Sequence, residues 1–230
     1  MTTYSSSQTE MRIQLAQRFY NVFTLLFYDL IVYGLSSAFI WKVPTKFLIQ
    51  FYNKNLTNTH LEVGVGTGFL LDESTFLSDK PHIVLMDMNT TCLKKTAQRI
   101  RRYAPYSIEY NILAPTQLTG EFDSIAINYV FHCVPGSFKE KGVAFLRLKK
   151  LMKPSGVLFG CTLLTHGVQR NWASRLLMKR YNKMGIFNNE QDSLVELEAV
   201  LRAVYHYVQI IPKGSAAVFR ASDMPLNGSI

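Results

Sequence analysis

Cysteine is scarce in this sequence, and its spacing fits no metal site. The 230 residues include three cysteines, Cys92, Cys133 and Cys161. An odd and widely spaced set excludes a disulfide framework and a CxxC metal pair. We therefore expect no metal and a reducing compartment, the cytoplasm.

The sequence also lacks an export signal and an uninterrupted run of membrane length. Its first residues, MTTYSSSQTEMRIQLAQ, are polar and lack the basic-then-apolar pattern of a signal peptide. Residues 18–41 are the one candidate span, but Asn21, Asp29 and Gly34 interrupt them. A membrane helix needs about 20 mostly apolar residues. We expect this stretch to be buried or interfacial, with no transmembrane segment.

Acidic residues are few, and charged residues of either sign make up a small share of the chain. Asp and Glu number 16 against 25 Lys and Arg, which gives a formal charge of +9. Such a charge attracts phosphates or anionic lipid without recognising either. Hydrophobic residues make up 48% and charged residues 18%, a balance that excludes a disordered chain.

Strands and helices alternate along the chain. Apolar runs at 61–63, 82–86, 107–110, 122–128 and 157–163 predict strands, and helical patterns at 44–54, 91–103, 138–152 and 191–204 separate or follow them. Two runs around Pro212 to Ser215 predict a terminal antiparallel hairpin. This order favours one α/β domain, residues 1–230, with a mostly parallel sheet.

Three glycines follow the first predicted strand in HLEVGVGTGF, residues 60–69. Glycine permits backbone angles and close approaches that a Cβ forbids. Ligands of such sheets bind beyond the carboxyl ends of the strands, where this loop lies. Asp87 ends the second strand in LMDMN, and its carboxylate can accept hydrogen bonds from both hydroxyls of a ribose.

These residues resemble the class I S-adenosylmethionine-dependent methyltransferases. The EVGVGTG of residues 62–68 is similar to that family's first motif, Asp87 to its second-strand acid, and KPSG at 153–156 to the turn before its fifth strand. The G-x-G-x-G spacing after Glu62 differs from the G-x-G-x-x-G of nicotinamide dinucleotide folds. The resemblance implies a Rossmann-like fold with a seven-stranded sheet, helices on both faces and an antiparallel C-terminal hairpin.

The resemblance also implies a set of S-adenosylmethionine-binding residues. Glu62 would anchor the loop and compensate the cationic end of the cofactor, Asp87 would bind ribose, and Met88 would lie against adenine. Asn111 stands where the family often has an acid, and its amide oxygen can still accept a bond from the adenine amine. The full implied set is Glu62, Gly64, Gly66, Thr67, Gly68, Asp87, Met88, Asn111, Ile112, Asn128 and Tyr129.

Methyl transfer needs alignment and exclusion of water, with a base only where the acceptor must lose a proton. His132, just beyond the fourth strand, is the candidate base, and a structural histidine bonded to backbone is its alternative. His166, after the fifth strand, is a second candidate placed near the acceptor. The N-P-P-[YF] tetrapeptide of the family's DNA and protein-amide methylating members is absent, since the sequence here is NYVFHC.

Two segments outside the core are candidates for acceptor selection. Residues 1–55 form a predicted helical lid, short of charge and rich in aromatics, that resembles the leading helix of small-molecule methyltransferases of the 11/12 type. On that resemblance Tyr20 and Tyr28 are candidate substrate contacts. Residues 166–188 form a predicted basic helical insertion with Arg175, Lys179 and Lys183 at helical spacing.

We therefore expect a cytoplasmic methyltransferase acting on O or N of a hydrophobic or aromatic small molecule. One alternative is an RNA methyltransferase that uses the basic surface. Another is a protein that binds S-adenosylmethionine without transferring methyl, such as a scaffold or a non-redox cyclase. A homodimer is left open.

Overall fold

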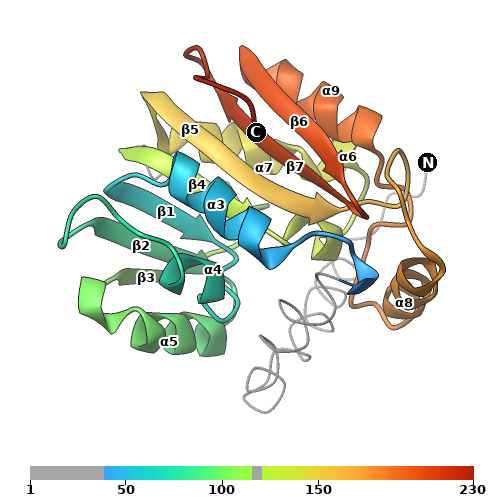
Figure 1. Cartoon of the computed structure of the whole chain (residues 1–230), viewed down its shortest axis with the longest axis horizontal. Coiled ribbons are helices and arrows are strands. Elements are labelled where there is room, and N and C mark those ends of the chain that lie inside the picture. Colours follow the sequence, from blue (N-terminus) through green and yellow to red (C-terminus); the bar gives the residue numbers. More distant parts are fainter. Residues whose placement is uncertain (1–38, 116–120) are drawn as a thin grey trace.

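The computed structural model describes residues 39–115 and 121–230, and it places them around one seven-stranded sheet (Figure 1). The strand order is β3-β2-β1-β4-β5-β7-β6. The strands are β1 (Thr59–Val63), β2 (His82–Asp87), β3 (Tyr106–Glu109), β4 (Phe122–Asn128), β5 (Met152–Leu163), β6 (Tyr207–Lys213) and β7 (Ala216–Ser222).

Strands β1 to β5 pair in parallel, and β7 joins β5 and β6 antiparallel. The predicted parallel sheet with a terminal hairpin is therefore confirmed. The chain order reverses between β1 and β4, so the ends of these two neighbouring strands open onto the switch point where ligands bind in such sheets.

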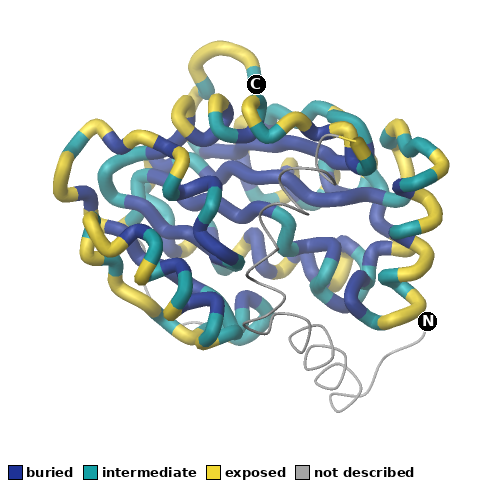
Figure 2. Tube along the Cα trace, turned by 60° about the horizontal axis from the view of Figure 1, so that its bottom comes forward, coloured by how far each residue is buried: buried dark blue, intermediate teal, exposed yellow. Residues whose placement is uncertain are grey.

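Helices cover both faces of the sheet (Figure 1). One apolar cluster packs α3, α4, α5 and α8 on one face, and a second packs α6, α7 and α9 on the other. Figure 2 shows buried residues running through the middle of the molecule, with exposed residues mostly toward its outside. The helices are α3 (Thr45–Asn55), α4 (Phe69–Asp72), α5 (Thr90–Arg99), α6 (Phe138–Lys141), α7 (Val143–Lys150), α8 (Trp172–Lys183) and α9 (Leu194–Val204), with 3-10 turns η2 (Arg101–Tyr103) and η3 (Phe131–Cys133).

Two sequence-based boundaries differ from the structure. Strand β5 begins at Met152 and includes the KPSG tetrapeptide, which we had expected to form a turn before the strand. The pairing with β4 shifts register between Phe122 and Ser124, so the extra residues are absorbed as an irregularity at the start of the strand pair. Similarly, Pro212 and Lys213 belong to β6, and the hairpin turn is Gly214–Ser215.

Helix α3 belongs to the core. Leu48, Phe51 and Tyr52 are buried against the sheet, and Trp41 just before the helix is also buried. The carbonyl of Trp41 accepts a hydrogen bond from the amide of Ser215 at 2.7 Å, which joins this segment to the β6–β7 turn. Tyr20 and Tyr28 lie outside the described residues. Across residues 39–115 and 121–230, no helix has the length and apolar character needed to cross a membrane.

Candidate active site

The glycine loop leaves β1 with backbone angles that other residues rarely adopt. Gly64, Gly66 and Gly68 have φ of 70°, 53° and 72°. A Cβ on Gly64 would stand 2.1 Å from Cγ2 of Val130, so the loop packs directly against the segment after β4. A Cβ on Gly66 would meet nothing within 4 Å. Gly64 is therefore needed for packing, and Gly66 leaves space open.

Glu62, the last acidic residue before the loop, is held by hydrogen bonds to both carboxylate oxygens. Tyr52 OH donates to Oε1 at 2.7 Å, and Nε2 of His60 lies 3.1 Å from Oε2. Tyr52 and His60 are fully buried, and Glu62 is 5% exposed. The carboxylate thus has a fixed position at the carboxyl end of β1.

Asp87 lies half-buried at the end of β2. Its Oδ1 accepts a hydrogen bond from the amide of Asn89 at 2.8 Å. Burial raises the pKa of Asp87 above its ordinary value, and backbone hydrogen bonds from Asn89, Val65 and Gly66 oppose that rise. Asn89 caps α5, because its side chain accepts from the amides of Thr91 and Cys92.

Two further pairs of residues lie at or just after the carboxyl ends of β3 and β4. Asn111 turns the chain after β3, because its Oδ1 accepts from the amide of Leu113 at 2.8 Å, and Ile112 beside it is buried. Asn128 ends β4 and is 7% exposed. Tyr129 follows with a φ of 55°, in the left-handed region that non-glycine residues occupy mainly where surrounding structure enforces it.

All these strand ends open onto one cavity. Of the residues implied to bind cofactor, the cavity wall includes all except Thr67, which is buried with its carbonyl accepting from Arg99. Among the described residues, the wall carries two acidic side chains, Glu62 and Asp87, and no Lys, Arg or His. The wall also includes residues that sequence analysis did not propose as ligand contacts, among them Tyr52, Phe69, Leu70, Leu71, Cys92, Tyr110, Leu113, Val130, Cys133, Val134 and Pro135.

The cavity wall is acidic although the whole chain has a formal charge of +9, so the negative charge is local to the cavity. Opposite charges attract over the few ångströms of such a site, so the wall favours a cationic ligand and disfavours phosphates. Burial raises the pKa of Cys92 to about 12, which keeps that wall thiol neutral.

His132 lies beside the cavity, in η3, but is not among the described wall residues; its neighbour Cys133 is. The imidazole is 4% exposed and packs edge-on against Phe187, with ring centroids 4.4 Å apart. Its Nδ1 has no hydrogen-bond partner among the described residues. Burial, with a smaller contribution from the charge of Lys141, lowers the pKa of His132 to about 3.

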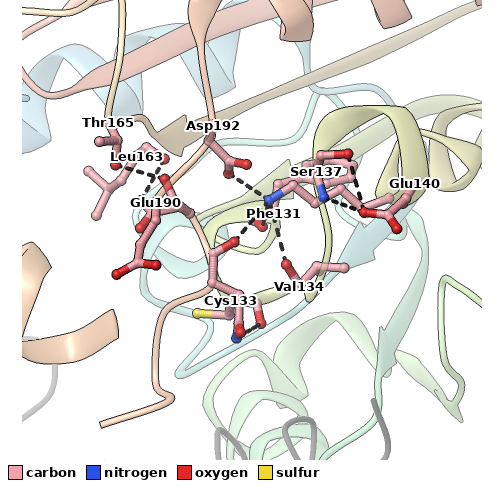
Figure 3. Close-up of polar contacts among 12 residues, drawn as sticks. Phe131, Cys133, Val134, Ser137, Glu140, Leu163, Thr165, Glu190 and Asp192 are labelled. Carbon is pink, nitrogen blue, oxygen red and sulfur yellow. Dashed lines mark hydrogen bonds and ion pairs between the residues drawn. The ribbon is translucent and has the colours of Figure 1, made fainter. Parts of the chain in front are cut away.

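A buried ion pair holds the segment that carries His132. Lys141 Nζ lies 2.6 Å from Oδ2 of Asp192, and both side chains are inaccessible to solvent. Lys141 also donates to the carbonyl of Phe131 at 3.0 Å. Figure 3 shows the Asp192 carboxylate and the main chain of Phe131 and Val134 around this ion pair. The loop before α9 is therefore bound to the segment after β4.

His166 follows β5 and lies beside the loop before α9, where it pairs with Ser193. Its side chain is exposed, and Nε2 lies 3.1 Å from the carbonyl of Glu190. Its amide donates to the carbonyl of Asp192 at 3.0 Å. The structure therefore does not bring His166 to the described cavity wall.

Among the wall residues that sequence analysis did not single out, Tyr52 bonds to two that it did, Glu62 and Asn128. It belongs to a helix that precedes β1, and its hydroxyl contacts residues 10 and 76 positions away. A buried tyrosine in an amphipathic helix has no sequence signal that separates it from an ordinary core residue.

Residues 61–158 match a methyltransferase domain family. The demethylluteothin O-methyltransferase of Streptomyces thioluteus is 37% identical over 226 residues, covering 96% of this chain and 98% of that protein. The chain belongs to the class I methyltransferases.

A second relative of this methyltransferase is methyltransferase ctvB of Aspergillus terreus, 36% identical and covering 96% of this chain and 98% of that protein. Among solved structures, DhpI in complex with SAH has a TM-score of 0.65 at 12% identity, covering 96% of this chain and 100% of that one. This structural likeness supports the Rossmann-like fold. The family assignment rests on the sequence relatives.

Proposed function

We propose that this methyltransferase binds S-adenosylmethionine in the described cavity and transfers its methyl group to an oxygen of a hydrophobic or aromatic small molecule. The observation that carries the proposal is the cavity wall, where a glycine loop and two carboxylates meet and no described cationic side chain is present. S-adenosylmethionine carries a sulfonium and an ammonium and has no phosphate. A phosphate-rich dinucleotide would meet repulsion at the same wall.

The residues of this cavity fit the parts of that cofactor. Asp87 would accept from the two ribose hydroxyls, and Gly66, with no atom near its Cβ position, leaves room for close approach to the loop. Met88 and Ile112 would border adenine, with Asn111 beside it. Glu62 would compensate positive charge near the methionine portion. These roles are the proposed ones for the wall residues predicted from sequence.

S-adenosylmethionine supplies a methyl group on a cationic sulfur, activated for displacement by a nucleophile. The protein therefore has to orient the acceptor in line and exclude water. The apolar side of the wall, with Phe69, Leu71 and Val134, suits the exclusion of water. No charged catalytic group is needed for that alignment.

His132 remains the candidate base in this proposal. With a pKa near 3 the imidazole is neutral at physiological pH, so its unpartnered Nδ1 is able to accept a proton. The same low pKa makes it a weak base, which suits an acceptor whose proton becomes acidic only as the methyl group is transferred.

The relatives support oxygen, and not nitrogen, as the atom that accepts the methyl group. The protein that is 37% identical over nearly the whole chain is named an O-methyltransferase of demethylluteothin. We infer an acceptor of similar class, a small organic molecule with a hydroxyl group. The N-terminal residues, including Tyr20 and Tyr28, are proposed to contribute to its pocket.

Methyl-labelled S-adenosylmethionine tests the function directly. We expect separate pools of phenolic metabolites, RNA and protein to show label in the metabolite pool, with turnover insensitive to added salt. RNA binding through phosphate contacts would instead fall steeply as salt rises. Site-specific label in RNA with rapid turnover would contradict the proposal.

Asp87→Ala tests the cofactor site. Loss of hydrogen bonds to a charged acceptor should raise the Kd for S-adenosylhomocysteine about 10- to 100-fold. Asp123→Ala is the control, because Asp123 is half-exposed, pairs with Lys153 and is not among the described wall residues. Equal affinities for the two variants in calorimetry would sink the assignment of Asp87.

A further inference from the structure

Tyr52 joins three elements of the site through its hydroxyl group. The side chain comes from α3 and is fully buried, with its ring edge-on to Phe159 at 5.1 Å. Its hydroxyl lies 2.7 Å from Oε1 of Glu62 on β1 and 2.9 Å from Nδ2 of Asn128 on β4. Tyr52, Glu62 and Asn128 all line the cavity.

The direction of these hydrogen bonds follows from the chemistry of the groups. A carboxylate has no proton to donate, so the single hydroxyl proton of Tyr52 goes to Glu62. The tyrosine oxygen can then only accept from Asn128. The amide of Asn128 must therefore present its NH₂ group to Tyr52, which turns its carbonyl oxygen the other way.

The contact at the other carboxylate oxygen of Glu62, Oε2, is consistent with Glu62 acting as the acceptor. His60 Nε2 lies 3.1 Å from Oε2 of Glu62, and His60 Nδ1 lies 2.8 Å from the Ser124 hydroxyl. The tautomer with its proton on Nε2 donates to Glu62 and accepts at Nδ1 from Ser124, whose oxygen also accepts from the amide of Thr57 at 3.1 Å. This bond and the one from Tyr52 engage both carboxylate oxygens of Glu62.

This arrangement leaves one acceptor unused. The Oδ1 atom of Asn128 is buried and has no hydrogen-bond partner among the described residues. A buried acceptor without a donor is destabilising until a donor reaches it. The carboxylates of Glu62 and Asp87 on the same wall favour a donor with positive charge.

We propose that Tyr52 is a positioning residue that orients the Asn128 amide so that its Oδ1 accepts a hydrogen bond from the ammonium group of the cofactor's methionine portion. The inference rests on the proposed function and adds two residue roles to it. Tyr52 acts on the ammonium group through Asn128. Without its hydroxyl, the amide is able to rotate and present NH₂, a donor that an ammonium group repels.

Two ligands that differ in the methionine portion test this role. S-adenosylhomocysteine contains the amino-acid portion with its ammonium and carboxylate groups, whereas 5′-methylthioadenosine keeps the adenosine and the sulfur without that portion. Tyr52→Phe removes one hydroxyl and keeps the buried ring. We expect this variant to raise the Kd for S-adenosylhomocysteine about tenfold and to leave the Kd for 5′-methylthioadenosine unchanged. A general loosening of the core would weaken both ligands equally.

A second variant shows whether Tyr52 acts through Asn128. Asn128→Ala should cause the same selective loss, and adding Tyr52→Phe to it should cause little further change, because the two residues act as one unit. If Tyr52→Phe does not fold, the selectivity of Asn128→Ala for the ammonium-bearing ligand still decides the role of Oδ1. Equal weakening of both ligands, or additive effects in the double variant, would overturn the inference.

The wild-type protein separates this inference from the proposed function. Absence of binding to either ligand would contradict the cofactor site as a whole. Binding of both by the wild type, with no selective loss in the variants, would contradict only the role of Tyr52 and Asn128.

Discussion

His132 is a neutral side chain enclosed by aromatic rings, near a buried cation. Phe187 and Tyr129 pack on its ring, and Lys141 contributes to lowering its pKa to about 3. This residue therefore links the stability of the protein to pH.

Comparison with His132→Phe should isolate this dependence. In the unfolded chain histidine has its ordinary pKa of 6.5, so below that pH the unfolded state binds a proton that the folded state refuses down to about pH 3. The stability conferred by the neutral form is fully present above pH 6.5 and is lost as pH falls toward 3. Phenylalanine keeps the ring contacts and cannot titrate.

We expect the free energy of unfolding of the wild type to fall relative to the variant by about 1.4 kcal/mol per pH unit across that range. Urea denaturation at several pH values measures this difference. Contributions of Asp192 and Lys141 are present in both proteins and largely cancel. Parallel pH profiles for the two proteins would show that His132 titrates normally.

At the level of elements, the loop after β1 and the segment after β4 both line the cavity. Their contact is made by Gly64 against Val130. The Lys141–Asp192 ion pair fixes the outer side of the β4 segment to the loop before α9. The cavity wall is therefore built by local backbone conformation on one side and by a long-range ion pair on the other.

Gly66→Ala and Gly185→Ala form a matched pair for the loop. Both glycines have positive φ, 53° and 71°, and neither has an atom within 4 Å of the Cβ position. Each alanine should therefore cost about 1–2 kcal/mol of backbone strain. Only Gly66 lies in the cavity wall.

Gly66→Ala should in addition raise the Kd for S-adenosylhomocysteine about tenfold or more, because the new methyl group occupies space that the ligand needs. Thermal unfolding and calorimetry on both variants give the two quantities separately. The same affinity in both variants would mean that the loop is not in contact with the ligand.

The Lys141–Asp192 ion pair should be strongly coupled. Lys141→Met leaves a buried carboxylate without its partner and should destabilise the protein by about 3–5 kcal/mol, whereas Lys141→Met combined with Asp192→Leu should recover much of that loss. Lys153→Met is the control, since it breaks a half-exposed pair with Asp123 and should cost at most about 1 kcal/mol. Denaturant titration of the wild type, Lys141→Met, Asp192→Leu and the double variant measures the coupling, and additive effects in the double variant would contradict it.

On the scale of the whole molecule, positive charge and acidic site are separated. The chain has a formal charge of +9, yet the described cavity wall has only acidic charges. The basic stripe predicted for residues 166–188 lies on α8, where Arg175 and Lys183 are exposed. The charge of the described cavity wall therefore differs in sign from the net charge of the chain.

Deletion of residues 1–33 tests the proposed lid at this scale. The truncated chain keeps Trp41 and α3, which complete the apolar core, and the bond from Trp41 to the β6–β7 turn. We expect it to retain binding of S-adenosylhomocysteine within a few-fold and to lose acceptor turnover by more than about tenfold. Full turnover after truncation would remove the N-terminal residues from acceptor binding.

The sheet and the glycine loop were predictable because their signals are local. Buried parallel strands are short apolar runs, and the strand–turn–helix order places Gly64 to Gly68 and Asp87 at neighbouring strand ends. The start of β5 was not predictable in the same way. Pairing with β4 extends that strand through Pro154 and Gly156, two residues that locally favour a turn.

The family, the mostly parallel sheet and the glycine loop after β1 were all predicted from the sequence. Tertiary structure alone decided that Tyr52 meets Asn128, 76 residues away, and that Lys141 meets Asp192 across 51 residues. The reason is physical: periodicity records which face of an element is apolar, whereas a polar contact between distant elements depends on their packing angle and register. Those contacts set the orientation of the polar groups at the cavity, and with it the ligand chemistry we infer.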